Sequence, residues 1–445
     1  MIFKFRGTIL LDFLFSLFGR TGRAAINMLV LILLARIMKP ADLGVYLLVF
    51  SVSLPLSLIS LYGLPQSYIR LSAKSDDREI KKLTLLEVSA LLAHFAVSAG
   101  LSLIALVLHQ FSPWQLNILI FVLTLTWAFL AAQQFIFAEI FRVREAYFLS
   151  ALFGGSLSPL LMLVALLAYP FFFPKETLGP VACVLGVTFA LAFSNALALF
   201  FLLARVKPYF NFPEVKRLFL KQCIALYASG GPVLVAGLVT VFLPQVTMWL
   251  AGLLLGPEEV SNLGVALRLM FFVTLPLWVG NTVLPPTFAK LQTSNRSRDL
   301  QEMVSLVCGV LLLITIPTFI MLMIFPEEIL SLLFGSHYSA AAGALRNLAI
   351  GYCAYAVLGT SITVLTYGKH RSYLIVISLF AVLMFMGTCL LLRGVLTVEF
   401  LAFALSLSFL TYGASAAYFC LRHERVNVLK ISLSKLGLRM LVKKI

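Results

Sequence analysis

Long apolar runs follow one another along almost the whole chain, and they constrain the fold more than any other feature. Each run has about 20 residues, the length with which an α-helix crosses the hydrocarbon core of a bilayer. We count twelve runs, near residues 12–37, 43–67, 83–108, 115–138, 146–170, 178–204, 223–250, 262–289, 302–325, 345–368, 372–392 and 398–421. The predicted fold is therefore an all-α, polytopic membrane protein of about twelve transmembrane helices, with no room for a sizeable soluble domain.

The net charge of +16 raises the question of a nucleic-acid partner, and the distribution of the charges argues against one. If the N-terminus is cytoplasmic, 26 of the 34 Lys and Arg residues fall in cytoplasmic segments. The loops on the opposite side hold only Lys39, Lys175 and Arg393. This asymmetry is the positive-inside pattern of membrane proteins. It predicts a multi-pass protein with both termini in the cytoplasm, membrane lipids as its surroundings and no nucleic-acid partner.

A basic connection near the midpoint divides the chain into two halves. Residues 205–222 interleave Lys and Arg with Phe and Leu, which suits a helix lying in the cytoplasmic interface. We expect an N-terminal six-helix bundle over 1–204, this linker, a C-terminal six-helix bundle over 223–421 and a basic cytoplasmic tail over 422–445. The turn Pro40–Gly44 is echoed at Pro257–Gly264, and transporters built from such repeats bind their substrate between them. A central cavity between the two bundles is therefore predicted.

The cysteines do not indicate a metal site or a disulfide. All six lie in or at the ends of apolar runs, and none has the spacing of metal ligands. We expect no cofactor, no metal and no disulfide. The basic N-terminus precedes an apolar run that is too long for a signal peptide, so the first span is expected to remain in the protein.

The first apolar helix carries a narrow polar stripe. At 100° per residue, Asp12, Ser16, Arg20, Arg23 and Asn27 fall within roughly 80° of one another. A charge inside a bilayer is costly unless it faces a bundle interior or water. The stripe is thus predicted to face a protected cavity, where the two arginines and the asparagine contact substrate. The alternative is a structural role, in which the arginines pair with Asp12 or with backbone carbonyls.

Three further polar residues inside predicted spans are candidates for function. Arg268 in the eighth span would be the second-half counterpart of the cationic stripe, unless it extends its charge to the outer interface. Glu87 and His94 share one face of the third span, where His titrates near neutral pH and could couple transport to protons. The alternative for His94 is a buried histidine satisfied by a neighbouring helix.

Two motifs resemble a known transporter family. Leu34-Ala35-Arg36 followed by Pro40-Ala41-Asp42-Leu43-Gly44-Val45-Tyr46 is similar to the first-helix signature of the Wzx-like polysaccharide flippases, which serve O-antigen and capsule synthesis. Leu332-Leu333-Phe334-Gly335, with Tyr338, Ala341, Ala342 and Leu345 and then Gly368-Lys369, resembles the pattern around the ninth to eleventh helices of that family. The family belongs to the superfamily that unites multidrug, oligosaccharidyl-lipid and polysaccharide exporters. The related lipid II flippase generally has two further C-terminal helices.

The resemblance implies a fold like that of the multidrug exporters and a flippase activity. The implied substrate is an undecaprenyl-diphosphate-linked oligosaccharide, moved across the bacterial inner membrane to the periplasm by alternating access. Arg20, Arg23, Asn27 and Arg268 would line the cavity and hold the diphosphate, because the planar guanidinium matches phosphate geometry. A polysaccharide polymerase and a chain-length regulator are candidate partners, and we expect a monomer.

Two other functions compete with a flippase. A cation-coupled multidrug antiporter would need carboxylates deep in the membrane, whereas Asp12, Glu87, Glu139 and Glu399 lie at or near span ends. A polymerase or ligase would need a large outer loop with catalytic groups. The longest outer loop, residues 326–344, has Glu327, Glu328 and His337. The prediction is a transporter and not an enzyme.

Overall fold

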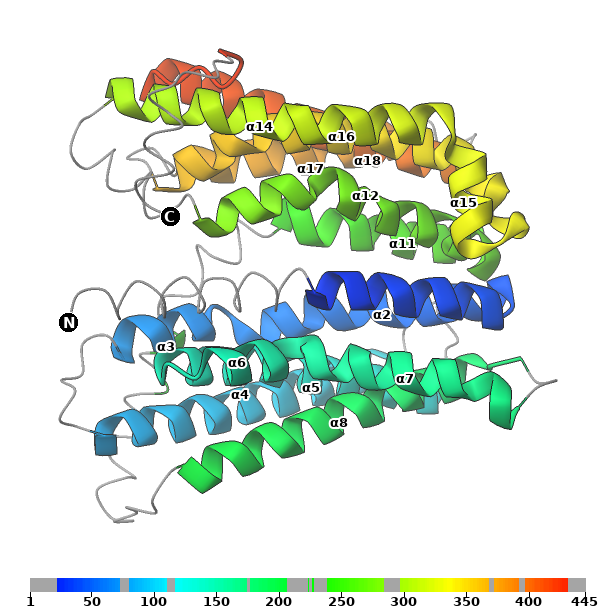
Figure 1. The fold of residues 1–445 in the computed structure, drawn as a ribbon, viewed down its shortest axis with the longest axis vertical. Coiled ribbons are helices and arrows are strands. Elements are labelled where there is room, and N and C mark those ends of the chain that lie inside the picture. The colour runs from blue at the N-terminus through cyan, green and yellow to red at the C-terminus, as the bar shows by residue number, and fades with distance from the viewer. Residues whose placement is uncertain are drawn as a thin grey trace. The chain divides into compact units, whose positions relative to one another are not determined.

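The structure is a computed structural model of the 445-residue chain. It describes residues 22–72, 80–109, 117–173, 177–205, 223, 226–227, 238–283, 297–367, 372–391 and 397–430, in which all regular structure is helical (Figure 1). These residues include ten helices that are long and apolar enough to cross a membrane, together with a shorter apolar helix, Val239–Leu254. The chain divides into two compact units, Met1–Leu234 and Val235–Ile445.

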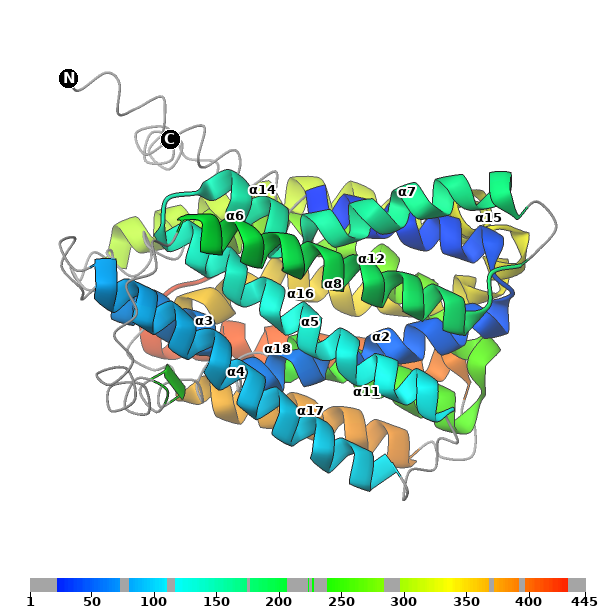
Figure 2. The same cartoon turned by 90° about the horizontal axis from the view of Figure 1, so that it is seen from below.

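The first unit is built around one helix, α5 (Ile118–Val143), which packs against most of its neighbours. Residues 22–37 are helical and lead into the other elements, which are α2 (Pro40–Leu61), α3 (Leu64–Ser72), α4 (Ile80–His109), α6 (Tyr147–Ala151), η1 (Leu152–Ser156), α7 (Leu157–Phe172) and α8 (Pro180–Arg205). Figure 2 shows α5 running between α4 and α8. Its buried aromatic side chains Phe137 and Phe141 anchor the core of the unit.

The second unit is organised around the pair α16 (Ala342–Tyr367) and α18 (Val398–Phe419). Gly351 lets them approach closely, because a Cβ at that position would overlap the backbone of Ser406. The remaining elements are η2 (Leu238–Phe242), α11 (Leu243–Leu254), α12 (Pro257–Val283), α14 (Ser297–Ile324), α15 (Pro326–Phe334), η3 (Ser336–Ala341), α17 (Tyr373–Leu391) and η4 (Cys420–Glu424).

The ten candidate spans correspond one to one with predicted spans 2–6 and 8–12. Predicted span 1 is described as helix over 22–37, and predicted span 7 is helical over 238–254. The prediction of an all-α, polytopic membrane protein is therefore confirmed. Residues 206–222 of the linker, where an interfacial helix is predicted, and residues 431–445 of the predicted tail lie outside the described residues.

The division of the chain into two units falls between Leu234 and Val235, inside the seventh predicted span. The reason is local packing on the first unit. Leu226 is fully buried in its core, and the Tyr227 hydroxyl donates a hydrogen bond of 3.2 Å to the Ser60 carbonyl.

The start of the predicted tail is anchored to the second unit. The backbone N–H of Asn427 donates a hydrogen bond of 2.6 Å to Gln301 Oε1, and Gln301 Nε2 donates one of 2.8 Å to the backbone carbonyl of Asn427. Val426 and Val428 beside it are buried. Residues 422–430 thus pack as part of the second unit.

Candidate substrate-binding site

Arg23 lies inside the first unit, where three elements meet. It is in the first turn of the described helical segment 22–37, and its guanidinium lies 5.3 Å from the centre of the Phe135 ring of α5. Its Nη1 donates a hydrogen bond of 2.9 Å to the carbonyl of Gly154. Phe135 precedes the end of α5 by eight residues, about 12 Å of helix. The guanidinium therefore lies within the length of α5, and not beyond its C-terminal end.

The carbonyl that Arg23 uses is available because the helix is broken there. The π-helical turn η1 joins α6 to α7, and Gly154 and Gly155 within it leave helical backbone angles. Gly155 has a φ of +110°, a conformation that glycine adopts without steric cost. A broken helix leaves backbone groups without their usual i−4 partners, and a side chain then satisfies them.

The charge of Arg23 is not matched by an acid in the described residues. Within that part of the chain, no carboxylate lies within ion-pairing distance of its guanidinium. A carbonyl and a ring face stabilise a cation less than a carboxylate does. Asp12, on the same predicted stripe, lies outside the described residues. Asn27, four residues on, lies on the same face and is exposed, while Arg20 lies outside the described residues.

Gly155 is predicted to be intolerant of a side chain. A Cβ there would lie 2.5 Å from the Arg23 guanidinium carbon, and the backbone angle is unfavourable for any L-residue. We expect Gly155→Ala to lower the free energy of unfolding by about 1–3 kcal/mol, measured by thermal unfolding of the purified protein. Gly100→Ala in α4, where nothing lies within 4 Å of the new Cβ, is the matched control. Equal stability of the two variants would contradict the prediction.

Glu87 forms a salt bridge with Arg144, a residue to which the sequence analysis gave no role. Its two carboxylate oxygens accept hydrogen bonds from Nε and Nη2 of Arg144 at 2.6 and 2.7 Å. The Tyr68 hydroxyl donates a third bond, at 3.3 Å. The Glu87 side chain is 1% exposed, and the hydrogen bonds to it raise the pKa of Arg144. This arrangement joins the ends of α3, α4 and α5.

His94 has the surroundings of a buried, packed histidine. It is fully buried, and its ring stacks on Phe129 with centroids 5.4 Å apart and planes 7° apart. Its nitrogens lie 3.3 Å from the Ser98 hydroxyl and 3.5 Å from the Phe129 carbonyl. Glu87 and His94 share α4 but use separate partners.

Arg268 lies in the first half of α12. Helix α12 begins at Pro257, five residues before the predicted start of this span, so Arg268 is eleven residues, about 16 Å, into it. The first turn of the helix carries the acidic residues Glu258 and Glu259. Its guanidinium interacts electrostatically with the Tyr352 hydroxyl of α16.

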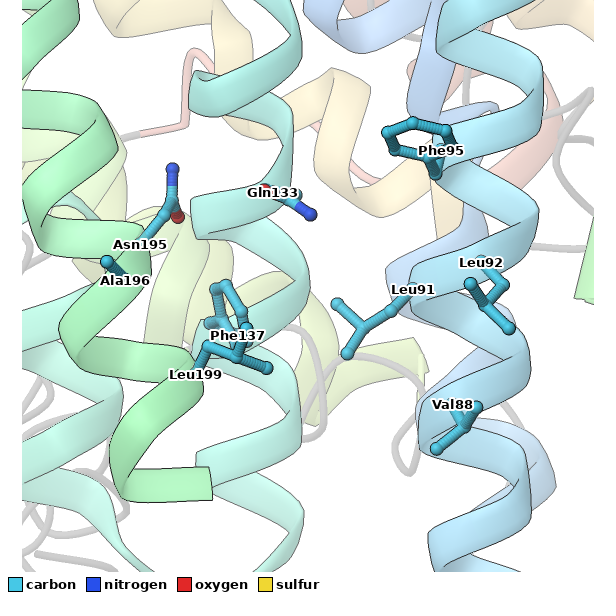
Figure 3. A pocket seen from close by; sticks show the side chains of 9 residues that line it. All are labelled: Val88, Leu91, Leu92, Phe95, Gln133, Phe137, Asn195, Ala196 and Leu199. Carbon is cyan, nitrogen blue, oxygen red and sulfur yellow. The ribbon is translucent and has the colours of Figure 1, made fainter. Parts of the chain in front are cut away.

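A separate cavity of about 390 Å³ opens between α4, α5 and α8 (Figure 3). Leu91, Phe95, Phe137 and Leu199 are among its lining residues, and Gln133 and Asn195 are the polar ones. None of the predicted site residues lines it. Its mainly aliphatic and aromatic wall suits hydrocarbon better than a charged group.

The sequence did not reveal which residues Arg23 and Glu87 would contact. Gly154, in the fifth predicted span, accepts the hydrogen bond from Arg23 and was not singled out from the sequence. The signal was present as Gly154-Gly155-Ser156 inside an apolar run, since paired glycines in a helix commonly mark a kink. The pairing of Glu87 with Arg144 had no comparable local signal.

Comparisons with known proteins agree with this architecture. The sequence profile of the family described as polysaccharide biosynthesis protein matches residues 9–292, and the MatE profile matches residues 232–391. No curated protein matches the chain by sequence.

Solved structures share the fold at low sequence identity. A structure titled lipid II flippase MurJ, in an inward closed conformation, is similar with a TM-score of 0.68 and 13% identity, covering 97% of this chain and 91% of that one. The MATE multidrug transporter DinF-BH is similar with a TM-score of 0.63 and 14% identity, covering 96% of each chain. A mutant of the Vibrio cholerae MATE transporter VcmN has a TM-score of 0.62 and 14% identity, covering 97% and 98%.

These findings confirm the predicted fold. The shared fold is that of MATE and MurJ transporters, two of whose relatives are described as belonging to the MOP superfamily. The profile match covers more than half of the sequence. The chain therefore belongs to the polysaccharide biosynthesis protein family.

Proposed function

We propose that this protein flips undecaprenyl-diphosphate-linked oligosaccharide units across the bacterial inner membrane, from the cytoplasmic to the periplasmic leaflet. Both termini would be cytoplasmic, as the charge asymmetry predicts, and the two units would alternate access. The family supports a role in polysaccharide biosynthesis. The observation that carries the proposal is Arg23, a guanidinium held within the length of α5 by a carbonyl and a ring, with no acid beside it in the described residues.

The electrostatics favour an anionic cargo. At an effective dielectric near 20, two unit charges about 4 Å apart interact by roughly 4 kcal/mol before desolvation is subtracted. The attraction between a diphosphate and Arg23 would offset much of the free energy that the diphosphate loses when it leaves water. Arg20 and Asn27, which the sequence predicts on the same helix face, belong to this proposed diphosphate site. Arg268 remains a proposed substrate contact in the second unit.

The multidrug antiporter is the alternative, because the MatE profile covers residues 232–391. The carboxylates of the first unit argue against it. Glu87 is paired with Arg144, and Glu139 is paired with Arg142 at 2.7 Å, so both are already neutralised. Bound cations would have to displace these arginines. If transport is coupled to ions, His94 is the better candidate of the predicted pair, because Glu87 is occupied.

Reconstitution tests the proposal directly. The full-length protein is placed in vesicles with a fluorescent undecaprenyl-diphosphate-linked N-acetylglucosamine, with and without an imposed ion gradient. We expect label from the inner leaflet to become accessible to an impermeant quencher faster than in protein-free vesicles. Equal rates of label exposure in vesicles with and without the protein, whether or not an ion gradient is imposed, would overturn the proposal. Uptake of a cationic dye by the same vesicles, without movement of the lipid, would favour the antiporter.

A further inference from the structure

We propose that Tyr352, Tyr355 and Arg268 form a glycan-binding surface on the second unit, which takes the sugar portion of the cargo. This inference rests on the proposed flippase function and assigns to Arg268 a role different from diphosphate binding. The two tyrosines lie on α16, and the arginine lies on α12, which packs against it.

The two tyrosine rings are supported from behind by a second layer of rings. Tyr352 and Tyr355 both pack on Phe409 of α18, with centroids 4.6 and 5.1 Å apart. Tyr355 also stacks on Tyr412, at 6.3 Å and 24°. Phe409 and Tyr412 are each 1% exposed, whereas Tyr352 and Tyr355 are only half-buried. A rigid inner layer thus presents an outer pair of rings.

The hydroxyls of the outer pair are available to a ligand. Within the described residues, neither hydroxyl makes a hydrogen bond to protein. Neither belongs to the buried polar atoms that have no hydrogen-bond partner, of which the Tyr338 hydroxyl is one. The residues lie ten and thirteen positions into α16, about 15 and 20 Å along it, near the middle of the span. Phenylalanine would fill the same space without a polar atom. A phenol at this depth is favourable when a polar group meets it.

Arg268 adds a cation to the same place. It lies on α12, which packs against α16, and its charge acts on the Tyr352 hydroxyl. Helix α12 also approaches α16 closely, since a Cβ at Gly359 would lie 2.6 Å from the Leu277 side chain.

This combination matches a sugar better than the other parts of the cargo. Sugar C–H groups pack on the electron-rich face of an aromatic ring, while sugar hydroxyls accept from guanidinium and exchange hydrogen bonds with phenols. A polyprenyl chain would leave the two phenols without partners. A diphosphate would use the guanidinium but not the ring faces.

Two lipid probes separate sugar binding from diphosphate binding. We would measure binding of undecaprenyl diphosphate and of undecaprenyl-diphosphate-linked N-acetylglucosamine to the full-length protein in nanodiscs. The wild type is expected to bind the glycosylated probe roughly tenfold more tightly, the contribution of two net hydrogen bonds. Tyr352→Phe with Tyr355→Phe keeps both rings and should bring the two affinities together. Tyr418→Phe, which removes a phenol that contacts Arg422, should keep the tenfold difference.

The outcomes distinguish this inference from the function on which it rests. Equal binding of both probes by the wild type, or a tenfold difference that survives in the double phenylalanine variant, would overturn the glycan surface. Failure of the wild type to bind either probe would overturn the proposed function as well. Arg23→Ala should weaken both probes alike and leave their ratio unchanged, whereas an altered ratio would contradict the assignment of sugar to the second unit.

Discussion

Replacing Arg23 with alanine is expected to abolish transport of the lipid-linked oligosaccharide while the protein remains inserted in the membrane. The change removes the guanidinium that we place against the diphosphate. An interaction of roughly 4 kcal/mol at about 4 Å, reduced by desolvation, corresponds to at least about a hundredfold loss of rate. Vesicle reconstitution measures the rate, and surface-polysaccharide export by cells measures the same step in vivo.

Two further substitutions at Arg23 separate its charge from its structural hydrogen bond. Arg23→Gln retains a donor for the Gly154 carbonyl but has no charge, so it should fold normally and fail to transport. Arg23→Lys keeps the charge without the planar fork of donors and should restore only part of the rate. Arg36→Ala, at the exposed far end of the same helix, is the control for loss of an arginine. Normal transport by the glutamine variant would remove the charge of Arg23 from the mechanism.

The spans could be predicted from sequence because hydrophobic length is a local property. A run such as 178–204 has to be helical in lipid, where every backbone group needs an internal partner, and α8 indeed covers Pro180–Arg205. Helix α15 occupies the start of the predicted outer loop 326–344. Ends were less predictable. Helix α12 starts at Pro257, because proline is well suited to the first turn of a helix. Arg268 is therefore eleven residues into the helix, and not six as the predicted start at residue 262 implied.

Contacts between distant residues account for what the sequence could not predict. Arg23 and Gly154 are 131 positions apart, and Glu87 and Arg144 are 57 apart. Helical periodicity gives the face on which a residue lies, but not the helix that it meets. For Arg23 the polar stripe indicated a protected environment. For Glu87 the charge alone suggested ion coupling, and only the packing of α4 against the end of α5 revealed its partner.

The salt bridge between Glu87 and Arg144 should be the most stabilising ion pair described in the first unit. Arg144→Ala would leave a carboxylate that is 1% exposed without its bidentate partner. Removing one member of a buried pair typically costs about 3–5 kcal/mol. We expect that loss in the free energy of unfolding, measured by denaturant titration of the detergent-solubilised protein.

The neighbouring pair supplies a matched control. Arg142 and Glu139 also form a salt bridge at 2.7 Å, but their side chains are 31% and 15% exposed and lie one helical turn apart. Arg142→Ala should therefore cost only about 0–1 kcal/mol. Adding Glu87→Gln to Arg144→Ala removes the stranded charge and should recover part of the stability, because the Tyr68 hydroxyl can still donate to the amide oxygen. Equally mild losses for Arg144→Ala and Arg142→Ala would contradict this ranking of the two pairs, because a buried carboxylate left without its partner should cost more than a partly exposed one.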